Sequence, residues 1–311
     1  MAHPFVVAVV VTWNRRDLLA ESLTATLAQT RPPDRVVVVD NASTDGTADL
    51  LHERFPGVAV VRTARNCGGA GGFALGIREA LAAVPGALLW MMDDDTVPEA
   101  TALAALVEAR TAYAGPPPAL VASRVVWTDG RDHPMNTPRP RPWAGRAACE
   151  RAARIGCVPI RSASFVSVLI DGQVVAERGL PIADYFLWND DFEFTTRVIR
   201  GNVGLSCSAS VVVHKTGTFV STDSDPGERF FYEVRNKIWL LTRSGGLSPA
   251  EKFLYGGRTL LRWVATVVRS PDRRTLLGCL AAGLIRGVAA GPRPTADVLA
   301  ESGAGGESGR G

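Results

Sequence analysis

The sequence has almost no excess of either charge. Its 311 residues include 34 Lys and Arg and 31 Asp and Glu, which gives a formal net charge of +3. A chain with this balance is not expected to bind nucleic acid through its overall charge. The basic residues are nevertheless clustered: residues 139–154 hold five arginines and one acid, and residues 251–293 hold eight basic residues and two acids. Such clusters indicate an anionic surface or ligand.

Long apolar runs and paired cysteines are also missing. No stretch reaches the roughly 18 uninterrupted apolar residues of a membrane span, so the sequence predicts no transmembrane helix. The run 5–11 is short and has no basic segment before it, which is typical of a buried first strand and not of a signal peptide. The five cysteines show no CxxC spacing. A zinc site is therefore not expected, and reduced thiols in the cytosol are the simplest interpretation.

The first hundred residues alternate between apolar runs and segments with helical spacing. Fully apolar strands separated by helices imply a parallel sheet that is covered on both faces. We expect an α/β fold, with a Rossmann-like, mostly parallel sheet sandwiched by helices. The predicted strands are 6–11, 36–39, 58–61 and 88–92, and the predicted helices are 17–29, 44–55, 71–84 and 98–112.

The remainder of the chain divides into strands and then helices. Residues 129–162 are rich in Arg, Pro and Gly and predict a long loop. Arginines interrupt the apolar residues of the last two predicted helices, so these helices predict either contact with a membrane surface or an ordinary bundle. Three regions follow: an α/β domain at 1–225, a helical region at 226–290 and a disordered tail at 291–311. The predicted elements are strands 120–127, 164–170 and 203–213, and helices near 190–200 and at 228–242, 249–269 and 271–290.

Three carboxylates follow the fourth predicted strand. Asp93, Asp94 and Asp95 come directly after the apolar run 87–92. Carboxylates at the end of a buried strand are costly unless they are neutralised, and ligands of open parallel sheets bind at this end of the strands. Mn²⁺ and Mg²⁺ prefer oxygen ligands, so the triplet predicts a metal site for a phosphorylated substrate. The alternative is a solvated turn before a helix that starts at 96–99.

Polar residues and glycines follow the second and third predicted strands. Asp40 and Asn41 stand where an acid can bind a ribose or base, although Asp also caps helices. The glycines at 68–72 let backbone N–H groups approach a phosphate, or form a tight turn without a ligand. They do not form GxGxxG in the first strand–helix turn, and no GK[ST] follows. A dinucleotide site and a P-loop are therefore poor fits.

A second acidic cluster lies at the start of a later predicted helix. Asp190 and Asp191 stabilise a helix N-terminus by their charge, and beside Trp188 they are also candidates for a general base next to a sugar-stacking aromatic. His214 ends a predicted strand. A lone histidine is more often structural, but at a strand end opposite carboxylates it is a candidate metal ligand.

The order of these segments resembles the inverting family 2 glycosyltransferases with the GT-A fold. The resemblance covers about residues 5–245. Within that family, the triple Asp and the segments 66–75 and 225–231 are most similar to actinobacterial galactofuranosyltransferases, with rhamnosyltransferase-like members next. The motifs that carry the resemblance are Thr12–Arg15, Asp40–Ser43, Arg65–Asn66 with its glycines, Asp93–Asp95, Asn189–Asp191 and His214.

The resemblance implies roles for individual residues. Asp93, Asp95 and His214 would bind Mn²⁺ or Mg²⁺ on a diphosphate. Asp191 would deprotonate the acceptor hydroxyl, while Asp190 and Trp188 would position the acceptor. The residues that would bind the donor substrate are Thr12, Asn14, Arg15, Asp40, Asn41, Asn66, Gly68, Gly69 and Asp94.

Two assignments near the acceptor are less direct. The adjacent Asp190 leaves the identity of the base open by one position. We prefer Asp191, because a neighbouring acid raises its pKa and makes it a more competent base. Arg235 and Asn236, on the predicted helix 228–242, are expected to contact the diphosphate of the acceptor.

The implied activity is metal-dependent, inverting sugar transfer from a UDP- or dTDP-linked donor to a lipid-linked or cell-envelope glycan. Galactofuranose is favoured, and rhamnose from dTDP-rhamnose is the first alternative. A sugar nucleotidyltransferase is disfavoured, because residues 12–17 lack a Gly-rich basic signature. A non-catalytic nucleotide-sugar-binding module is disfavoured by the intact acids. We expect a cytoplasmic protein, peripheral on the inner face of the cell membrane, with homo-oligomerisation left open.

Overall fold

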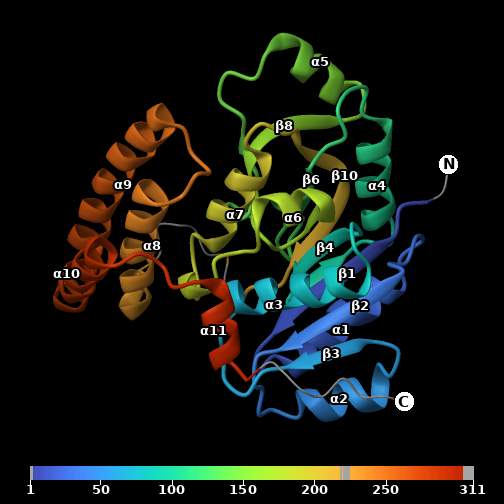
Figure 1. The fold of residues 1–311 in the computed structure, drawn as a ribbon, viewed down its shortest axis with the longest axis horizontal. Coiled ribbons are helices and arrows are strands. Elements are labelled where there is room, and N and C mark those ends of the chain that lie inside the picture. The colour runs from blue at the N-terminus through green and yellow to red at the C-terminus, as the bar shows by residue number, and fades with distance from the viewer. Residues whose placement is uncertain (1–2, 218, 220–224, 304–311) are drawn as a thin grey trace.

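The computed structural model describes residues 3–217, 219 and 225–303. Within them, ten strands form one sheet in the order β3-β2-β1-β4-β9-β6-β10-β8-β7, and β5 pairs with β10 (Figure 1). The strands are β1 (Val6–Thr12), β2 (Arg35–Asp40), β3 (Ala59–Arg62), β4 (Leu88–Asp93), β5 (Thr96–Pro98), β6 (Leu120–Val126), β7 (Arg139–Pro140), β8 (Cys157–Ser162), β9 (Val168–Asp171) and β10 (Gly204–His214).

Most strands run in one direction, as predicted. β1 pairs in parallel with β2 and β4, β2 with β3, and β6 with β10. β9 lies antiparallel between β4 and β6, and β8 and β5 are antiparallel to β10. The carboxyl ends of β1, β2, β3, β4, β6 and β10 therefore meet at the same edge of the sheet.

Both faces of the sheet are buried, which explains the continuous apolar strands. Alternate residues of β1 enter different cores: Val6, Ala8 and Val10 face one, while Val7 and Val9 face the other. One core is closed by α1 (Arg16–Leu27), α2 (Thr47–Arg54) and α4 (Ala102–Ala112). The opposite core is closed by α3 (Gly68–Ala83), α6 (Gly172–Arg178), α7 (Asp190–Ile199) and α11 (Thr295–Glu301).

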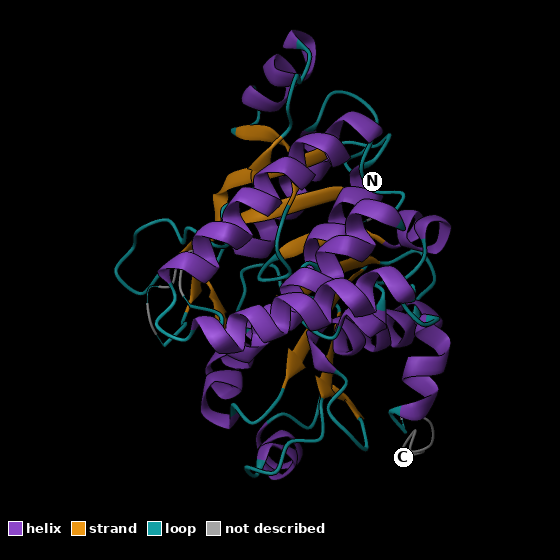
Figure 2. Ribbon diagram, turned by 90° about the vertical axis from the view of Figure 1, so that its left-hand side faces the viewer, coloured by secondary structure: helices purple, strands orange, loops and turns teal. Residues whose placement is uncertain are grey.

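Three helices extend the fold beside the sheet. They are α8 (Phe230–Thr242), α9 (Pro249–Arg269) and α10 (Arg273–Ala289), and they share a small core of their own. A β-carbon at Gly283 or Gly287 would lie 2.8 Å from Val234 or Ile238, so only glycines let α10 approach α8 this closely. Figure 2 views the molecule from this side and shows the helices in front of the sheet. No helix among the described residues is long and apolar enough to cross a membrane.

Several sequence-based predictions are wrong in detail. The proposed helix start at 96–99 is strand β5, and α4 begins only at Ala102. The expected loop 129–162 contains β7, α5 (Arg146–Ala153) and β8. Within the tail that was expected to be disordered, α11 buries Val298 and Leu299 in the main core, and only 304–311 lie outside the described residues. Two 3-10 helices, η1 (Ala183–Tyr185) and η2 (Gly227–Arg229), complete the secondary structure.

Candidate active site

The first acidic cluster lies at the shared carboxyl edge of the sheet. Asp93 is the last residue of β4, and His214 is the last residue of β10. One carboxylate oxygen from each of Asp93 and Asp95 and one ring nitrogen of His214 all lie within 4.8 Å of one another. β5 brings these segments together, because Thr96 pairs with His214.

The donor set of this cluster fits a divalent cation. Asp95 Oδ1 is buried and lacks a hydrogen-bond partner among the described residues, although it lies 3.0 Å from His214 Nε2. Two carboxylates and one imidazole suit Mn²⁺, and the two carboxylates also suit Mg²⁺. Burial raises the pKa of Asp93 to about 7 and that of Asp94 to about 6, so negative charge on this cluster is costly unless a cation offsets it.

Arg15 supplies part of the compensating charge. Its Nη1 lies 2.5 Å from Asp95 Oδ2 and 3.2 Å from Asp94 Oδ1. Half of its side chain remains exposed, so the guanidinium borders the cluster from the solvent side. A group in this position can also meet the phosphates of a bound nucleotide.

A second layer of side chains orients His214, and the sequence did not reveal it. Asn136 Oδ1 lies 2.9 Å from His214 Nδ1, and the ring of His133 packs 5.1 Å from the His214 ring. When Nδ1–H donates to Asn136, the lone pair of Nε2 faces Asp95, which is the arrangement of a metal-binding histidine. His133 and Asn136 both lie in the segment that was expected to be a loop. The only sequence signal for this second layer was an imidazole and an amide three positions apart.

The residues after β1 and β2 form a polar shelf beside the acids. Thr12 Oγ1 donates to Asp94 Oδ2 at 2.8 Å, and the carboxamide oxygen of Asn14 accepts from the backbone N–H of Thr44 at 2.7 Å. Asp40 Oδ1 accepts from the backbone of Ser43, while its buried Oδ2 forms an ion pair with Arg62 Nε at 3.4 Å but no hydrogen bond among the described residues. A hydroxyl or N–H group of a ribose or base would give this oxygen the hydrogen bond that it lacks.

The glycines form the first turn of α3, three residues earlier than predicted. Gly68 has φ +73°, and a β-carbon there would lie 2.1 Å from Phe186 O. Asn41 Nδ2 donates to Gly68 O at 3.0 Å, and Asn66 Oδ1 accepts from the Gly68 backbone at 2.7 Å. A β-carbon at Gly69 would lie 4.0 Å from Asp190 Oδ2. These glycines therefore let the segment after β3 approach Asp190 of the second acidic cluster.

The second acidic cluster begins α7 and is preceded by a strained loop. Phe186, Trp188 and Asn189 all have φ between 63° and 65°, which is costly for residues with side chains. Burial raises the pKa of Asp190 well above its usual value and also raises that of Asp191. Two adjacent acids with raised pKa values suit general-base chemistry.

Helix α8 holds this loop through its polar side chains. Asn236 Nδ2 donates to the carbonyl groups of Tyr185, Leu187 and Trp188 at 2.9 Å each. Glu233 Oε2 accepts from Asn189 Nδ2 at 2.7 Å, and Lys237 donates to Asn189 Oδ1. The positive charge of Lys237 lowers the pKa of Asp191 in part, against the effect of burial. Asn236 was expected to contact an acceptor beside Arg235, whereas Glu233 and Lys237 were not among the sequence-based candidates.

Arg235 faces the same loop from its other side. Its Nη2 donates to Asp184 O at 2.7 Å and to Tyr185 O at 3.2 Å, and its guanidinium lies 4.3 Å from the Trp239 ring centre. It also lines a cavity of about 240 Å³ together with Asn66. These contacts give Arg235 a role in holding the loop, and its contact with an acceptor remains a prediction.

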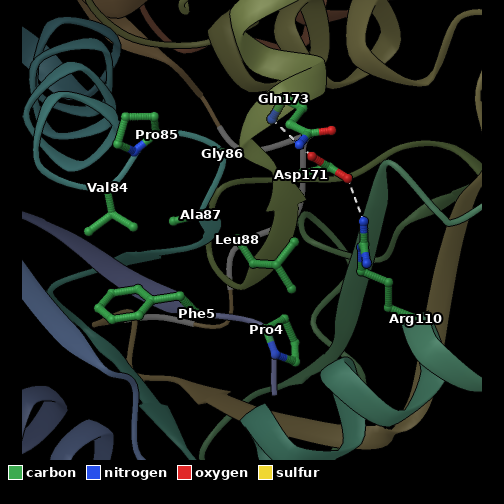
Figure 3. A pocket seen from close by; sticks show the side chains of 10 residues that line it. All are labelled: Pro4, Phe5, Val84, Pro85, Gly86, Ala87, Leu88, Arg110, Asp171 and Gln173. Carbon is green, nitrogen blue, oxygen red and sulfur yellow. Dashed lines mark hydrogen bonds and ion pairs between the residues drawn. The ribbon is translucent and has the colours of Figure 1, made fainter. Parts of the chain in front are cut away.

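Another cavity lies at the opposite end of the sheet. It has about 240 Å³ and is lined by Phe5, Leu88 and the ion pair of Arg110 with Asp171 (Figure 3). Leu88 begins β4 and Asp171 ends the antiparallel β9, so this cavity sits at the amino ends of the parallel strands. It is separate from the acidic clusters at the carboxyl edge.

Comparisons with known proteins agree with this geometry. Residues 7–157 match the profile of Glycosyl transferase family 2. The chain is 33% identical over 260 residues to galactofuranosyltransferase GlfT1 of Mycobacterium tuberculosis. The alignment covers 77% of this chain and 83% of the relative.

Two solved structures show the same fold at low identity. Staphylococcus aureus TarS 1–349, in complex with UDP-GlcNAc, superposes with a TM-score of 0.59 at 15% identity and covers 90% of this chain and 81% of its own. The mannosyltransferase PcManGT of Pyrobaculum calidifontis, in complex with GDP-Man and Mn²⁺, gives a TM-score of 0.54 at 21% identity. The match covers 97% of this chain and 80% of the PcManGT chain. At these identities the likeness establishes the GT-A fold alone. The profile match and the GlfT1 relative show that this chain is an enzyme of glycosyltransferase family 2.

Proposed function

We propose that this enzyme transfers galactofuranose from a nucleotide sugar to a cell-envelope or polyprenyl-diphosphate-linked glycan, with inversion at the anomeric carbon. The observation that carries the proposal is that two acidic clusters interact, since, besides burial, the charge of Asp93 helps to raise the pKa of Asp190, in a chain 33% identical to a galactofuranosyltransferase. The donor is proposed to carry UDP, and TarS, whose fold is similar, is described with UDP-GlcNAc.

Asp93, Asp95 and His214 are proposed to hold Mn²⁺ or Mg²⁺. When bound there, the cation neutralises the negative charge of the leaving diphosphate. Arg15 is proposed to add positive charge at the solvent side of the same phosphates. Thr12, Asp40 and Asn66 are proposed to bind the nucleoside.

Asp191 is proposed to take the proton from the attacking acceptor hydroxyl. An inverting transfer needs one base on the face of the sugar opposite the leaving group and needs no covalent enzyme intermediate. The half-buried Trp188 is proposed to stack on the acceptor sugar, and Asp190 to orient it. The enzyme is further proposed to work at the inner face of the cell membrane.

A donor screen tests this proposal. The purified chain with Mn²⁺ is titrated with UDP-galactofuranose, dTDP-rhamnose, UDP-glucose and GDP-mannose, and binding and slow hydrolysis are followed with and without EDTA. Selective, EDTA-sensitive turnover of UDP-galactofuranose is the expected result. Preference for dTDP-rhamnose would move the enzyme to the rhamnosyl branch, and absence of metal-dependent binding to every donor would overturn the proposed site.

A further inference from the structure

Helices α9 and α10 expose large apolar side chains along their outer sides. On α9, Phe253, Leu261 and Val264 are 83%, 74% and 64% exposed, and on α10 Ile285 and Val288 are 70% and 67% exposed. The steps between exposed positions are one, three, four, six or seven residues, which keep these positions on the same side of a helix with about 3.6 residues per turn, so each helix carries one apolar stripe. We call the following set the apolar face: Phe253, Leu254, Leu260, Leu261, Val264, Val268, Leu277, Leu284, Ile285 and Val288.

The apolar face is not the packing surface of the helical region. Trp263 of α9 and Leu276 of α10 point inward and join Phe230 and Val234 of α8 in a common core. The two helices have therefore already buried one side each, and the apolar face is a second, outward side. An apolar patch of this extent on a folded chain marks an interaction surface.

The charges around the apolar face are almost all positive. Five exposed arginines lie on or between the two helices, and none forms an ion pair with a residue that the structure describes. The two acids of this segment are engaged elsewhere: Glu251 pairs with Arg161, and Asp272 caps α10 through the backbone of Thr275. An apolar stripe with a basic border is complementary to an anionic lipid bilayer. The arginines are Arg258, Arg269, Arg273, Arg274 and Arg286.

The same charges disfavour a second copy of this chain as the occupant. In a symmetric dimer, each surface patch meets its own equivalent, so the arginines of one copy would approach those of the other. Like charges brought together in an interface are unfavourable, and these helices supply no free acids to offset them.

The inner side of α9 contacts the start of α7, next to the candidate base Asp191. Tyr255 lies 5.4 Å from the ring of Phe192, which follows Asp191. Arg262 pairs with Glu233, the residue that also binds Asn189. A helix with its side chains is about 10–12 Å across, so the apolar face and the start of α7 lie on opposite sides of a single helix.

We propose that the apolar face and its arginines lie on the anionic inner leaflet and hold Asp191 about one helix diameter from the lipid headgroups. The part concerning Asp191 rests on the proposed function. A sugar chain attached to a membrane-anchored diphosphate then reaches the base while its lipid remains in the bilayer. Docking orients the enzyme and limits its reaction to acceptors at the membrane surface.

Vesicle binding by the full-length protein tests the docking surface independently of activity. Vesicles of 30% phosphatidylglycerol in phosphatidylcholine are sedimented with wild type and with the double variant Leu261→Glu/Val264→Glu. Both side chains are exposed, so the fold is retained, and burial of two such side chains predicts roughly tenfold or more weaker partitioning of the variant. The matched control Val60→Glu/Val158→Glu changes exposed valines on the sheet and should bind as wild type does.

Charge is tested with Arg273→Glu/Arg274→Glu, which should weaken binding to anionic vesicles and remove most of its salt dependence. Equal vesicle binding by wild type and Leu261→Glu/Val264→Glu would overturn the proposal. The proposal would also be overturned if wild type formed a dimer, Leu261→Glu/Val264→Glu were a monomer, and neither protein bound vesicles. The apolar face would then join two copies of the chain.

An activity split separates this proposal from the proposed function. Leu261→Glu/Val264→Glu should retain metal-dependent donor hydrolysis in solution and lose at least about tenfold in transfer to an acceptor embedded in vesicles. Unchanged transfer to the embedded acceptor would contradict the docking role. If the wild-type protein showed no metal-dependent donor hydrolysis, that result would instead contradict the proposed function. The vesicle-binding experiment would still test the docking surface.

Discussion

Nε2 of His214, the last residue of β10, lies 3.0 Å from Oδ1 of Asp95, which lies 119 positions earlier in the turn between β4 and β5. The buried Asp95 oxygen has no hydrogen-bond partner among the described residues. A carboxylate oxygen and an imidazole nitrogen placed in this way support the proposed cation site.

Asp95→Asn should therefore weaken Mn²⁺ binding by at least about 100-fold, because an amide replaces one of two anionic ligands. Isothermal titration with Mn²⁺ alone measures this directly. Asp17→Asn is the matched control, since that carboxylate is fully exposed and lies outside the cluster. Equal Mn²⁺ affinity in the two variants would remove Asp95 from the metal site.

Asn136→Ala should lower Mn²⁺ affinity roughly 10–100-fold, although Asn136 is not a ligand. Its Oδ1 accepts from His214 Nδ1, which fixes the tautomer and orientation of the imidazole. Asn202→Ala also removes a side-chain amide that binds a single partner, the Val198 carbonyl, and serves as control. A normal affinity in Asn136→Ala would show that the histidine is held by other contacts.

Asp191→Asn should reduce kcat for transfer about 10²–10⁴-fold and leave the Kd of the donor–Mn²⁺ complex nearly unchanged. A base acts only on the acceptor hydroxyl, so donor binding does not need it. Asp190→Asn, tested in parallel, should affect KM for the acceptor more than kcat. If Asp190→Asn shows the larger loss of kcat, the base is one position earlier than proposed.

The pH profile of kcat/KM reports the state of the same base. Burial raises the pKa of Asp191, and the base is active only when deprotonated. Activity should thus fall as pH decreases through a value above about 3.9, the ordinary pKa of Asp. Lys237→Met removes a charge that lowers this pKa, so the acidic limb should move to higher pH. Lys252→Met should leave the limb in place; an equal shift there would point to a general charge effect.

Gly68→Ala should destabilise the fold by about 2–5 kcal/mol, as measured by urea unfolding, because the backbone strain and the overpacking add. Its backbone has φ +73°, and the new β-carbon would lie 2.1 Å from Phe186 O. Gly130→Ala isolates the backbone contribution, because Gly130 has φ +83° with no atom within 4 Å of the added carbon. That control should cost about 1–2 kcal/mol. Equal losses would mean that the contact between α3 and the Phe186 loop is not tight.

The sequence predicted the parts of the fold that depend on local pattern. The valines of β1 are buried on both faces, which a continuous β-branched run indicates, and α9 has the predicted bounds Pro249–Arg269 because Ser248 and Glu251 form a capping box. The sequence also indicated that Asp40, Asp93 and His214 lie at the carboxyl ends of strands. Ligands of such sheets bind at these ends.

Features that depend on tertiary contacts were missed. Gly68 can begin α3 only because it has no side chain, since a β-carbon there would collide with the backbone of Phe186. No local pattern in the sequence reveals this contact. Asn136 and Lys237 acquire their roles only from His214 and Asn189, which lie 78 and 48 positions away. Residues 295–301 are helical because Val298 and Leu299 enter a core that the first strands build. In each case, packing decides what local propensity leaves open.

The stereochemistry of transfer tests the central claim most directly. The enzyme is incubated with UDP-galactofuranose, Mn²⁺ and a polyprenyl-diphosphate-linked glycan, and the anomeric configuration of the product is determined by NMR. We predict a galactofuranosyl product with the anomeric configuration opposite to that of the donor, formed by wild type and lost with Asp191→Asn or EDTA. A product that retains the donor configuration, or equal yield from Asp191→Asn, would contradict the proposed mechanism.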